Sequence, residues 1–206
     1  MNAFIASTLA GCLLIATASR ATSVSVTLRN ASDAPLEDAI VVFDPLEAAI
    51  APAHATAIVD QINKRFVPRV SVVQTGTAIN FPNSDHIRHQ VYSFSPAKTF
   101  NLKLYAGSPS TQILFDKAGL VVLGCNIHDS MVGIIAVVDT PYFAKSTSSG
   151  NVALDLPPGK YRMRVWHAGL AQEFPPRTLQ IANVAQSLPV KLAIAYDSAA
   201  PAAWPE

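Results

Sequence analysis

The stretch GCNIHDSMVGIIAVV (residues 124–138) decides how this chain folds and where its chemistry lies. Its first half brings a thiol, an imidazole and a thioether together within seven residues, at Cys125, His128 and Met131. Its second half, Val132–Val138, is an apolar and largely β-branched run, which is typical of a buried strand. We therefore expect a tight loop between two strands that fixes three possible metal ligands relative to one another.

A second imidazole is available upstream, where His89 follows INFPNSD at the start of another expected strand. Two histidines and one cysteine in a plane, with methionine as a long axial ligand, form a type 1 (blue) copper site. His86 is a competing upstream ligand, but it lies in a polar turn, whereas His89 enters the strand directly. The pattern predicts one copper ion and one-electron chemistry, with the ligands His89, Cys125, His128 and Met131.

The first 21 residues have the features of a secretory signal, because residues 4–18 are mostly apolar and uncharged and are followed by small-x-Ala endings. Leu9–Cys12 also matches a bacterial lipobox in which Cys12 would be acylated, although the apolar run continues past Cys12 and favours cleavage. We expect a protein exported to the periplasm, with no integral membrane span in its mature chain.

Removal of the signal leaves Cys125 as a single thiol in an oxidising compartment, without a partner for an intrachain disulfide. Metal ligation explains such a cysteine. The alternative is an inert, buried cysteine that acts as a small hydrophobic side chain.

Composition excludes several classes of partner and activity. The formal net charge is +1 and no basic run occurs, so we expect neither nucleic acid nor anionic lipid as a partner. Asp85, Asp116 and Asp129 are not spaced as an acid–base pair, and no nucleophile elbow, phosphate loop or zinc-protease motif is present. We expect an electron-transfer or copper-binding protein, not an enzyme.

Apolar and polar residues alternate with a period of two in many segments, and glycines separate these segments. This pattern predicts an all-β fold. Residues 46–56 read as a linker, residues 145–150 as a polar loop and residues 197–206 as a flexible tail. The expected strands are 24–28, 39–43, 58–63, 69–74, 77–81, 90–94, 100–105, 112–115, 120–124, 132–138, 152–156, 161–166, 177–181 and 190–195.

Residues 57–140 resemble a cupredoxin domain. The C-x₂-H-x₂-M spacing is that of the amicyanin loop, whereas plastocyanin has a longer gap before methionine. The upstream match is IVDQINKRFVPRVSVVQTGTAINFPNSDHIRHQVYSF. The resemblance implies a Greek-key sandwich and the same four ligands. It also implies that Asn83 forms hydrogen bonds between the two ligand loops. Asp129 departs from the family, which usually has proline after the second histidine.

The flanks, residues 22–48 and 145–196, are similar to the two halves of a transthyretin-like, carboxypeptidase-regulatory-type module. The matching sequences are VSVTLRNASDAPLEDAIVVFDP and SSGNVALDLPPGKYRMRVWHAGL. This implies a second small β-sandwich made from both chain ends. The whole arrangement is similar to exported bacterial proteins of the methylamine utilization type.

Three functions compete on sequence grounds. The first is a periplasmic one-electron carrier or electron-transfer module with an unidentified redox partner protein. The second is a copper-binding or delivery protein, and the third is a structural β protein with a non-redox metal site. Two further histidines, His54 in the linker and His167 at a strand end, are expected to be structural or solvated.

Overall fold

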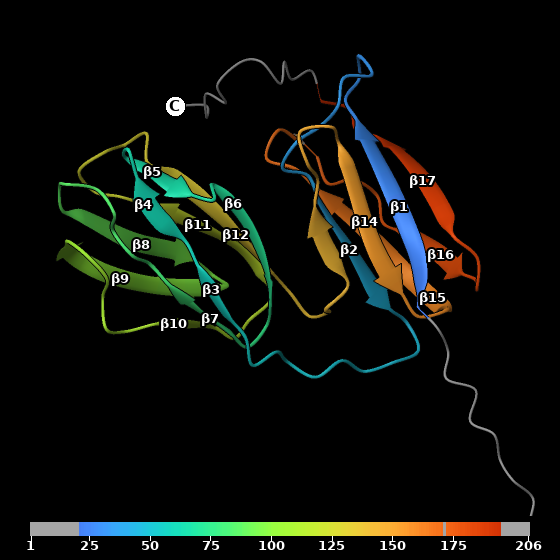
Figure 1. The fold of residues 1–206 in the computed structure, drawn as a ribbon, viewed down its shortest axis with the longest axis horizontal. Helices are drawn as coiled ribbons and strands as arrows, with labels where there is room; N and C mark the ends of the chain where they lie inside the picture. The colour runs from blue at the N-terminus through green and yellow to red at the C-terminus, as the bar shows by residue number, and fades with distance from the viewer. Residues whose placement is uncertain (1–20, 171, 195–206) are drawn as a thin grey trace, which may run out of the picture.

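The computed structural model describes residues 21–170 and 172–194, and all of the regular structure in these ranges is β. The all-β prediction is confirmed. Figure 1 shows two β bodies side by side, joined by the chain crossing between them. The expected signal with Cys12 and the expected tail at 197–206 lie outside the described residues. In the part of the chain that is described, no helix has the length and apolar character needed to cross a membrane.

One body consists of two sheets and a separate hairpin. The larger sheet has the order β6 (Val70–Gln74), β12 (Val132–Val138), β11 (Gly119–Gly124), β8 (His89–Ser95) and β9 (Lys98–Tyr105). The smaller sheet has the order β10 (Ile113–Phe115), β7 (Thr77–Asn80) and β3 (Thr56–Ile58), and the hairpin pairs β4 (Asp60–Ile62) with β5 (Arg65–Val67).

Side chains from both of these sheets enclose one core, which we call the ligand-side core. Its residues run from Val59 to Val137 and include Cys125 and Met131. The strand period explains their placement, because successive side chains face opposite sides of a sheet. On β8, for example, His89, Val91 and Ser93 are buried while the residues between them are not. The strand register therefore turns the first residue of β8 inward.

The other body is built from strands near both chain ends. One sheet has the order β14 (Asn151–Leu156), β1 (Thr22–Arg29) and β17 (Gln186–Lys191). The other has the order β13 (Phe143–Lys145), β2 (Ile40–Pro45), β15 (Gly159–Trp166) and β16 (Arg177–Ile181). A second core lies among these strands.

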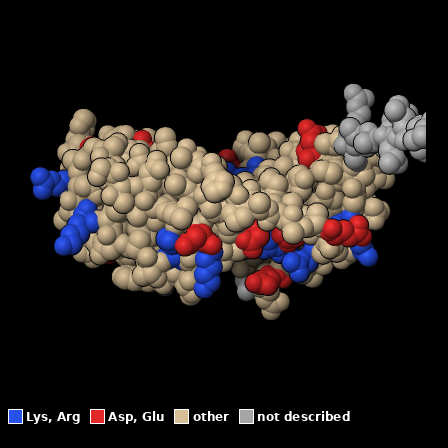
Figure 2. Space-filling view, turned by 90° about the horizontal axis from the view of Figure 1, so that it is seen from below, with Lys and Arg blue, Asp and Glu red and all other residues tan. Residues whose placement is uncertain are grey.

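The two bodies meet through a small apolar cluster. Ile40 and Val42 of β2 pack with Val70, Ala136 and Val138 of the larger sheet. Strand β12 is therefore buried on both faces, which explains its continuous apolar sequence. Basic and acidic side chains lie side by side over the middle and right of the face seen in Figure 2, as the near-zero net charge leads one to expect.

Two predicted strands need correction, and strands β5 and β13 were not predicted. The expected strand 58–63 is divided between β3 and β4, because pairing with β7 ends at Ile58. Residues 60–62 instead pair with β5 in a hairpin, whose turn is formed by Asn63 and Lys64, both with positive φ. The last strand lies at 186–191, not 190–195. It contains Pro189, which an edge strand tolerates because one of its sides needs no N–H donor. Strand β13 lies partly in the expected polar loop and was not predicted.

Candidate metal centre

The loop that joins β11 to β12 is short because the two strands are antiparallel neighbours, with Gly124 paired to Val132. Two backbone hydrogen bonds fold it: the N–H of His128 donates to the carbonyl of Cys125, and the N–H of Met131 donates to the carbonyl of His128. At Gly124, where the loop begins, an added Cβ would lie 2.7 Å from the ring of Tyr92, so this ring packs directly over the glycine. The loop therefore presents its three predicted ligands from a compact and constrained turn.

His89 reaches the same place from the neighbouring strand β8. Its side chain is completely buried, and Cys125 is only 3% exposed. The Nδ1 atom of His89 lies 3.8 Å from the Sγ atom of Cys125, and the ring centroids of His89 and His128 are 5.1 Å apart. One ligand atom from each of these three residues lies within 4.8 Å of the other two. The structure thus brings together three of the four predicted ligands.

These separations suit a metal ion. With zinc-like bond lengths of about 2.0 Å to nitrogen and about 2.3 Å to sulfur, two ligands at 120° have N and S about 3.7 Å apart. A tetrahedral angle would bring the same two atoms to about 3.5 Å. The observed distance of 3.8 Å between His89 Nδ1 and Cys125 Sγ is close to these values, as expected for two atoms that bind one metal ion.

A buried nitrogen of His128 is a second, independent indication that the site suits a metal ion. Its Nδ1 atom is buried and has no hydrogen-bond partner in the structure, although the residue as a whole is partly exposed. A buried polar atom without a partner is costly, because it loses its hydrogen bonds to water. Coordination of a metal by this nitrogen would satisfy it. A thiolate with two imidazole nitrogens is a donor set that copper and zinc both accept.

The orientation of His89 is fixed by Asp85. The Nε2–H of His89 donates to Asp85 Oδ2 at 2.7 Å. An ionised carboxylate only accepts hydrogen bonds, so Nε2 carries a proton, and in the neutral ring Nδ1 presents its lone pair toward Cys125. A carboxylate behind a ligating histidine is a recurrent feature of metal sites, because it fixes the ring and its tautomer.

Asp85 is itself held by the hairpin turn between β4 and β5. Its two oxygens accept the backbone N–H groups of Asn63 at 2.6 Å and Lys64 at 2.9 Å. Desolvation opposes ionisation of this carboxyl, but the hydrogen bonds from Lys64, His89 and Asn63 outweigh it and lower its pKa. Sequence reasoning missed this role, although a carboxylate four residues before a candidate ligand was a usable signal.

The predicted role of Asn83 needs correction in its detail. Its Nδ2 donates to the carbonyls of Ile87 and Tyr105, and its Oδ1 accepts the N–H of Asp85. These bonds fold the loop that carries His89 and tie it to the end of β9. They do not bridge to the loop of Cys125. Asn83 therefore acts on the site through Asp85.

A buried polar network supports the same loop from behind. Gln61 Nε2 donates to the carbonyl of Pro82 and to the hydroxyl of Tyr105, which in turn donates to the carbonyl of Phe81. Burial raises the pKa of Tyr105 to about 12, so the hydroxyl stays protonated and keeps donating well above neutral pH. Nothing in the sequence pattern indicated this network.

The remaining candidates are the fourth predicted ligand, Met131, and the three histidines outside the group, His54, His86 and His167. Met131 is 1% exposed and belongs to the same core as Cys125, but axial ligation by its sulfur stays a prediction. His86 and His54 are exposed and lie outside the His89–Cys125–His128 group. His167 is in the flanking body, where Nδ1 accepts the N–H of Gly169 and Nε2 donates to the carbonyl of Glu37.

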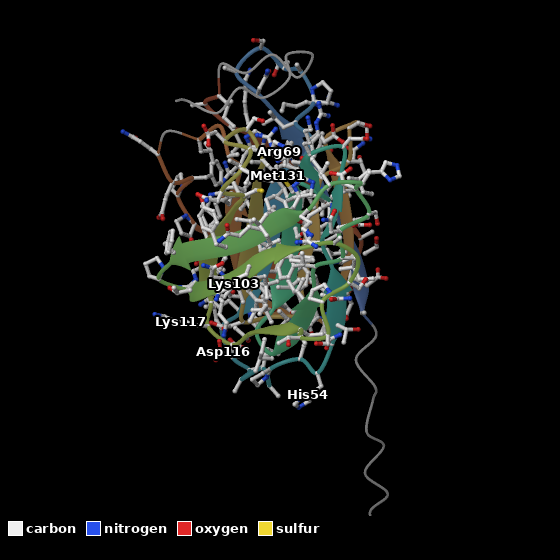
Figure 3. The ribbon with its side chains drawn as sticks, turned by 90° about the vertical axis from the view of Figure 1, so that its left-hand side faces the viewer. His54, Arg69, Lys103, Asp116, Lys117 and Met131 are labelled. Atoms are coloured by element: carbon white, nitrogen blue, oxygen red, sulfur yellow. The ribbon has the colours of Figure 1, made fainter. Side chains whose placement is uncertain are left out.

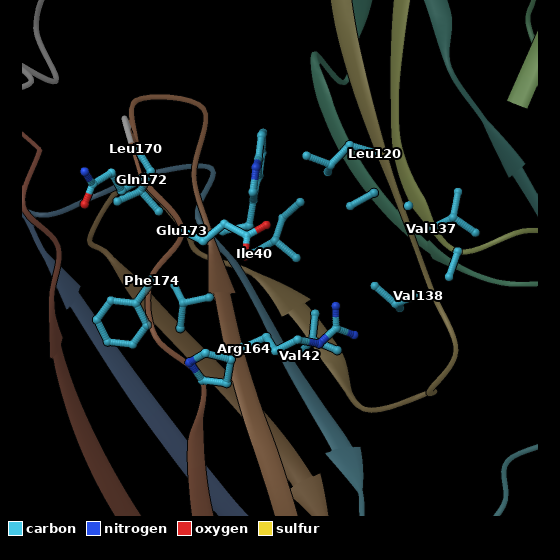
Figure 4. A pocket seen from close by; sticks show the side chains of 16 residues that line it. Ile40, Val42, Leu120, Val137, Val138, Arg164, Leu170, Gln172, Glu173 and Phe174 are labelled. Atoms are coloured by element: carbon cyan, nitrogen blue, oxygen red, sulfur yellow. The ribbon is translucent and has the colours of Figure 1, made fainter. Parts of the chain in front are cut away.

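A cavity of about 480 Å³ lies elsewhere, between the two bodies. Figure 4 shows Ile40 and Val42 on one side of it, with Leu120 and Val138 on the other. The guanidinium of Arg164, which lines this cavity, donates two hydrogen bonds to Asp44, from Nε to Oδ2 at 2.6 Å and from Nη2 to Oδ1 at 2.9 Å. None of the three grouped candidate ligands lines this cavity.

No protein-family model matches this chain, and no curated protein sequence matches it. Solved structures with similar segments include three copper or cupredoxin proteins. The copper-containing nitrite reductase of Thermus scotoductus SA-01 is 24% identical with a TM-score of 0.39, covering 47% of this chain and 26% of that one. The chain thus spans about a quarter of that enzyme.

The second is a purple cupredoxin from Nitrosopumilus maritimus, which is 22% identical with a TM-score of 0.35, over 40% of this chain and 98% of that one. The third is a reduced amicyanin mutant, which is 20% identical with a TM-score of 0.36, over 47% of this chain and 97% of that one. All three TM-scores are below 0.5, so no inference about this chain follows from them.

Proposed function

We propose that this protein binds one copper ion in a type 1 site and passes single electrons to and from a partner protein. His89, Cys125 and His128 would supply the three strong ligands, and Met131 the weak axial one. The observation that carries the proposal is the convergence of one sulfur and two imidazole nitrogens within 4.8 Å. Copper, when bound there, would supply the one-electron redox couple.

The chain's own residues are suited to holding both oxidation states with little movement. Cys125 and His89 are buried, which excludes water from the ligand atoms. The loop of residues 125–131 is fixed between two paired strands, and His89 is fixed by Asp85. A rigid first coordination sphere keeps the reorganisation small when an electron arrives or leaves, and this favours fast transfer.

A carrier is favoured over a catalyst because the proposed ligand set is complete. Catalytic metal sites keep an open position for substrate or water. Here three strong ligands and one axial ligand would surround the ion, and Cys125 and Met131 lie in a mostly apolar core. The same burial favours a retained ion over a delivered one, since release would require the 125–131 loop to open.

The wider organisation is part of the same proposal. Residues 57–140 form the cupredoxin-like, copper-binding region, and residues 22–48 and 145–196 form the flanking transthyretin-like module. Residues 1–21 export the chain to the periplasm. The likeness to methylamine-utilization-type proteins rests on sequence alone and assigns no process.

Copper titration with redox cycling tests the function. We expect one copper per chain, an intense blue colour in the oxidised form, and reversible bleaching and recovery over repeated cycles. Copper should exchange slowly with a chelator in both states. A colourless protein that gives up copper(I) readily to a chelator would instead support delivery. A protein that holds zinc in preference to copper would support a non-redox site.

A further inference from the structure

The cavity of about 480 Å³ between the two bodies has the features of a second binding site. We propose that it binds an amphipathic organic cation, in which an apolar chain or ring carries an ammonium group. This site is separate from the one proposed for copper and does not depend on it. The proposal rests on the volume of the cavity, on its apolar walls and on one carboxylate whose charge no neighbouring cation compensates.

The cavity and the candidate metal centre lie toward opposite ends of strand β11. Gly119 and Leu120, at the start of the strand, line the cavity, whereas Cys125 follows its last residue. Leu120 and Cys125 are thus separated by about 17 Å of extended chain, at about 3.3 Å per residue. Figure 3 shows the same separation, with Met131 and Lys117 well apart in the ligand-side body. A ligand in the cavity therefore has no contact with the grouped metal ligands.

The walls of the cavity are mainly apolar and come from both bodies. The flanking body contributes Ile40, Val42 and Trp166, and the ligand-side body contributes Leu120 and Val138. The cluster at which the two bodies meet includes Ile40, Val42 and Val138, so packing holds these walls in place. Binding clefts for small organic molecules commonly lie between domains, have largely apolar walls and enclose about 300–1,000 Å³. The cavity meets all three conditions.

The register of strand β15 turns a tryptophan and an arginine toward the cavity. Alternate residues of β15 are buried in the flanking core, and the residues between them, including Arg164 and Trp166, face away from that core. Arg164 is paired with Val42 of β2, and Trp166 is paired with Ile40. All four residues line the cavity. The indole is the aromatic ring that attracts cations most strongly.

Two charged residues, Arg164 and Glu173, are found among the described residues that line the cavity. The charge of Arg164 is compensated, because its guanidinium donates two hydrogen bonds to Asp44. Asp44 chiefly, and Asp139 and Glu173 through their charges, raise the pKa of Arg164 against the effect of burial. Glu173 itself forms none of the ion pairs found in the described part of the chain. The cavity therefore has an excess of negative charge.

The side chain of Glu173 is placed to meet a ligand. Figure 4 shows it extending from the segment between β15 and β16 into the group of lining side chains. A carboxylate and an indole beside apolar walls form a site for an ammonium group on a hydrocarbon body, because both attract the cation while the walls take up the hydrocarbon. An anionic ligand would find no uncompensated guanidinium here. Glu173 is exposed, so screening by solvent limits its effect to a modest factor in affinity.

Isothermal titration calorimetry of the full chain tests the proposal with three probes that differ only in their head group. The probes are 4-phenylbutylammonium, 4-phenylbutanol and 4-phenylbutyrate. The test variant is Glu173→Gln, which removes the charge at nearly constant size. The matched control is Glu47→Gln, which removes an exposed carboxylate outside the cavity.

A second pair of variants locates the site without changing any charge. Leu120→Trp places a larger side chain in the cavity. Val122→Trp makes the same kind of change two residues further along β11, at an exposed position on the same face and outside the cavity lining. Circular dichroism of all four variants checks that the sheets remain folded.

We expect one probe molecule to bind per chain, with the ammonium probe binding most tightly and the carboxylate probe least tightly. Glu173→Gln should weaken binding of the ammonium probe about fivefold and leave that of the alcohol within about twofold. Glu47→Gln should change neither by more than about twofold. Leu120→Trp should abolish binding of the probes, and Val122→Trp should retain it.

The proposal is overturned if no probe binds at millimolar concentration, or if the ammonium probe binds no more tightly than the other two. It is also overturned if Glu173→Gln and Glu47→Gln have equal effects, or if Leu120→Trp binds the probes as well as Val122→Trp does. None of these outcomes bears on copper binding, so the proposed function and the second site fail or succeed separately.

Discussion

Asp85 accepts a 2.7 Å hydrogen bond from Nε2 of His89, and this bond turns the other ring nitrogen toward the thiol of Cys125. The same carboxylate accepts two backbone N–H groups from the hairpin turn. The position of a buried imidazole is thus set by a turn more than twenty residues earlier in the chain. The candidate site is a product of this arrangement as much as of the ligand loop.

Replacement of Asp85 by Asn should weaken copper binding about 10- to 100-fold, as loss of such supporting carboxylates does in other metal sites. The amide has one oxygen in place of two, so either the N–H of Asn63 or the N–H groups of Lys64 and His89 lose their acceptor, and the amide supplies less negative charge to the imidazole. Competition with a chelator of known affinity measures the change. Asp129→Asn removes an exposed carboxylate from the ligand loop and is the matched control. Equal effects of the two substitutions would contradict the role of Asp85.

His89→Ala should abolish the type 1 spectrum, whereas His86→Ala should leave it nearly unchanged. His89 is buried beside Cys125, and His86 is exposed and outside the group. Circular dichroism of both variants checks that the sheets remain folded. A spectrum lost in the His86 variant and kept in the His89 variant would transfer the ligand role to His86.

Met131→Leu should retain copper and raise the reduction potential. A weak axial thioether adds little affinity, and its removal destabilises copper(II) more than copper(I). Leucine fills a similar buried volume, so we expect the free energy of unfolding to fall by less than about 1.5 kcal/mol. Voltammetry measures the potential and metal analysis measures the copper. Complete loss of copper would mean that Met131 is a strong ligand.

Acid should weaken the flanking body through His167. Burial lowers its pKa below 6.5, partly opposed by its hydrogen bond to Glu37, so the folded state favours the neutral ring. Its contribution to stability is present above pH 6.5 and is lost progressively as the pH falls through its lowered pKa. Protonation of Nδ1 also breaks the hydrogen bond from Gly169.

Urea unfolding at pH 8 and at pH 5.5 measures this effect. The unmodified protein should lose more stability between the two pH values than His167→Gln, which cannot titrate. Equal losses in the two proteins would show that His167 does not contribute to the acid sensitivity.

Much of the fold could be predicted because most strands carry a clear period-2 or continuous apolar pattern. Val132–Val138 is an example, and its burial on both faces accounts for its sequence. The three-residue strands β4, β5 and β13 could not be predicted in this way. They are too short to show a period: β4 and β5 pair with each other in a hairpin, and β13 is defined by its pairing with the distant strand β2.

The ligand set followed from residue types and spacing, because Cys125, His128 and Met131 lie on one loop. The choice between His86 and His89 depended on strand register, and the structure places His89 beside the thiol. The supporting residues were harder to foresee. Asp85 and Gln61 act through contacts with segments far away in sequence, and the predicted bridge by Asn83 differs from its actual partners.

The central claim, that Cys125 binds copper together with His89 and His128, is tested most directly by Cys125→Ser. The visible and electron paramagnetic resonance spectra of the copper(II)-loaded protein and of this variant should be recorded side by side. We expect the unmodified protein to show an intense sulfur-to-copper charge-transfer band and a narrow copper hyperfine splitting, both of which disappear in the variant. A variant that keeps the band, or an unmodified protein with only a pale, tetragonal copper spectrum, would contradict the account.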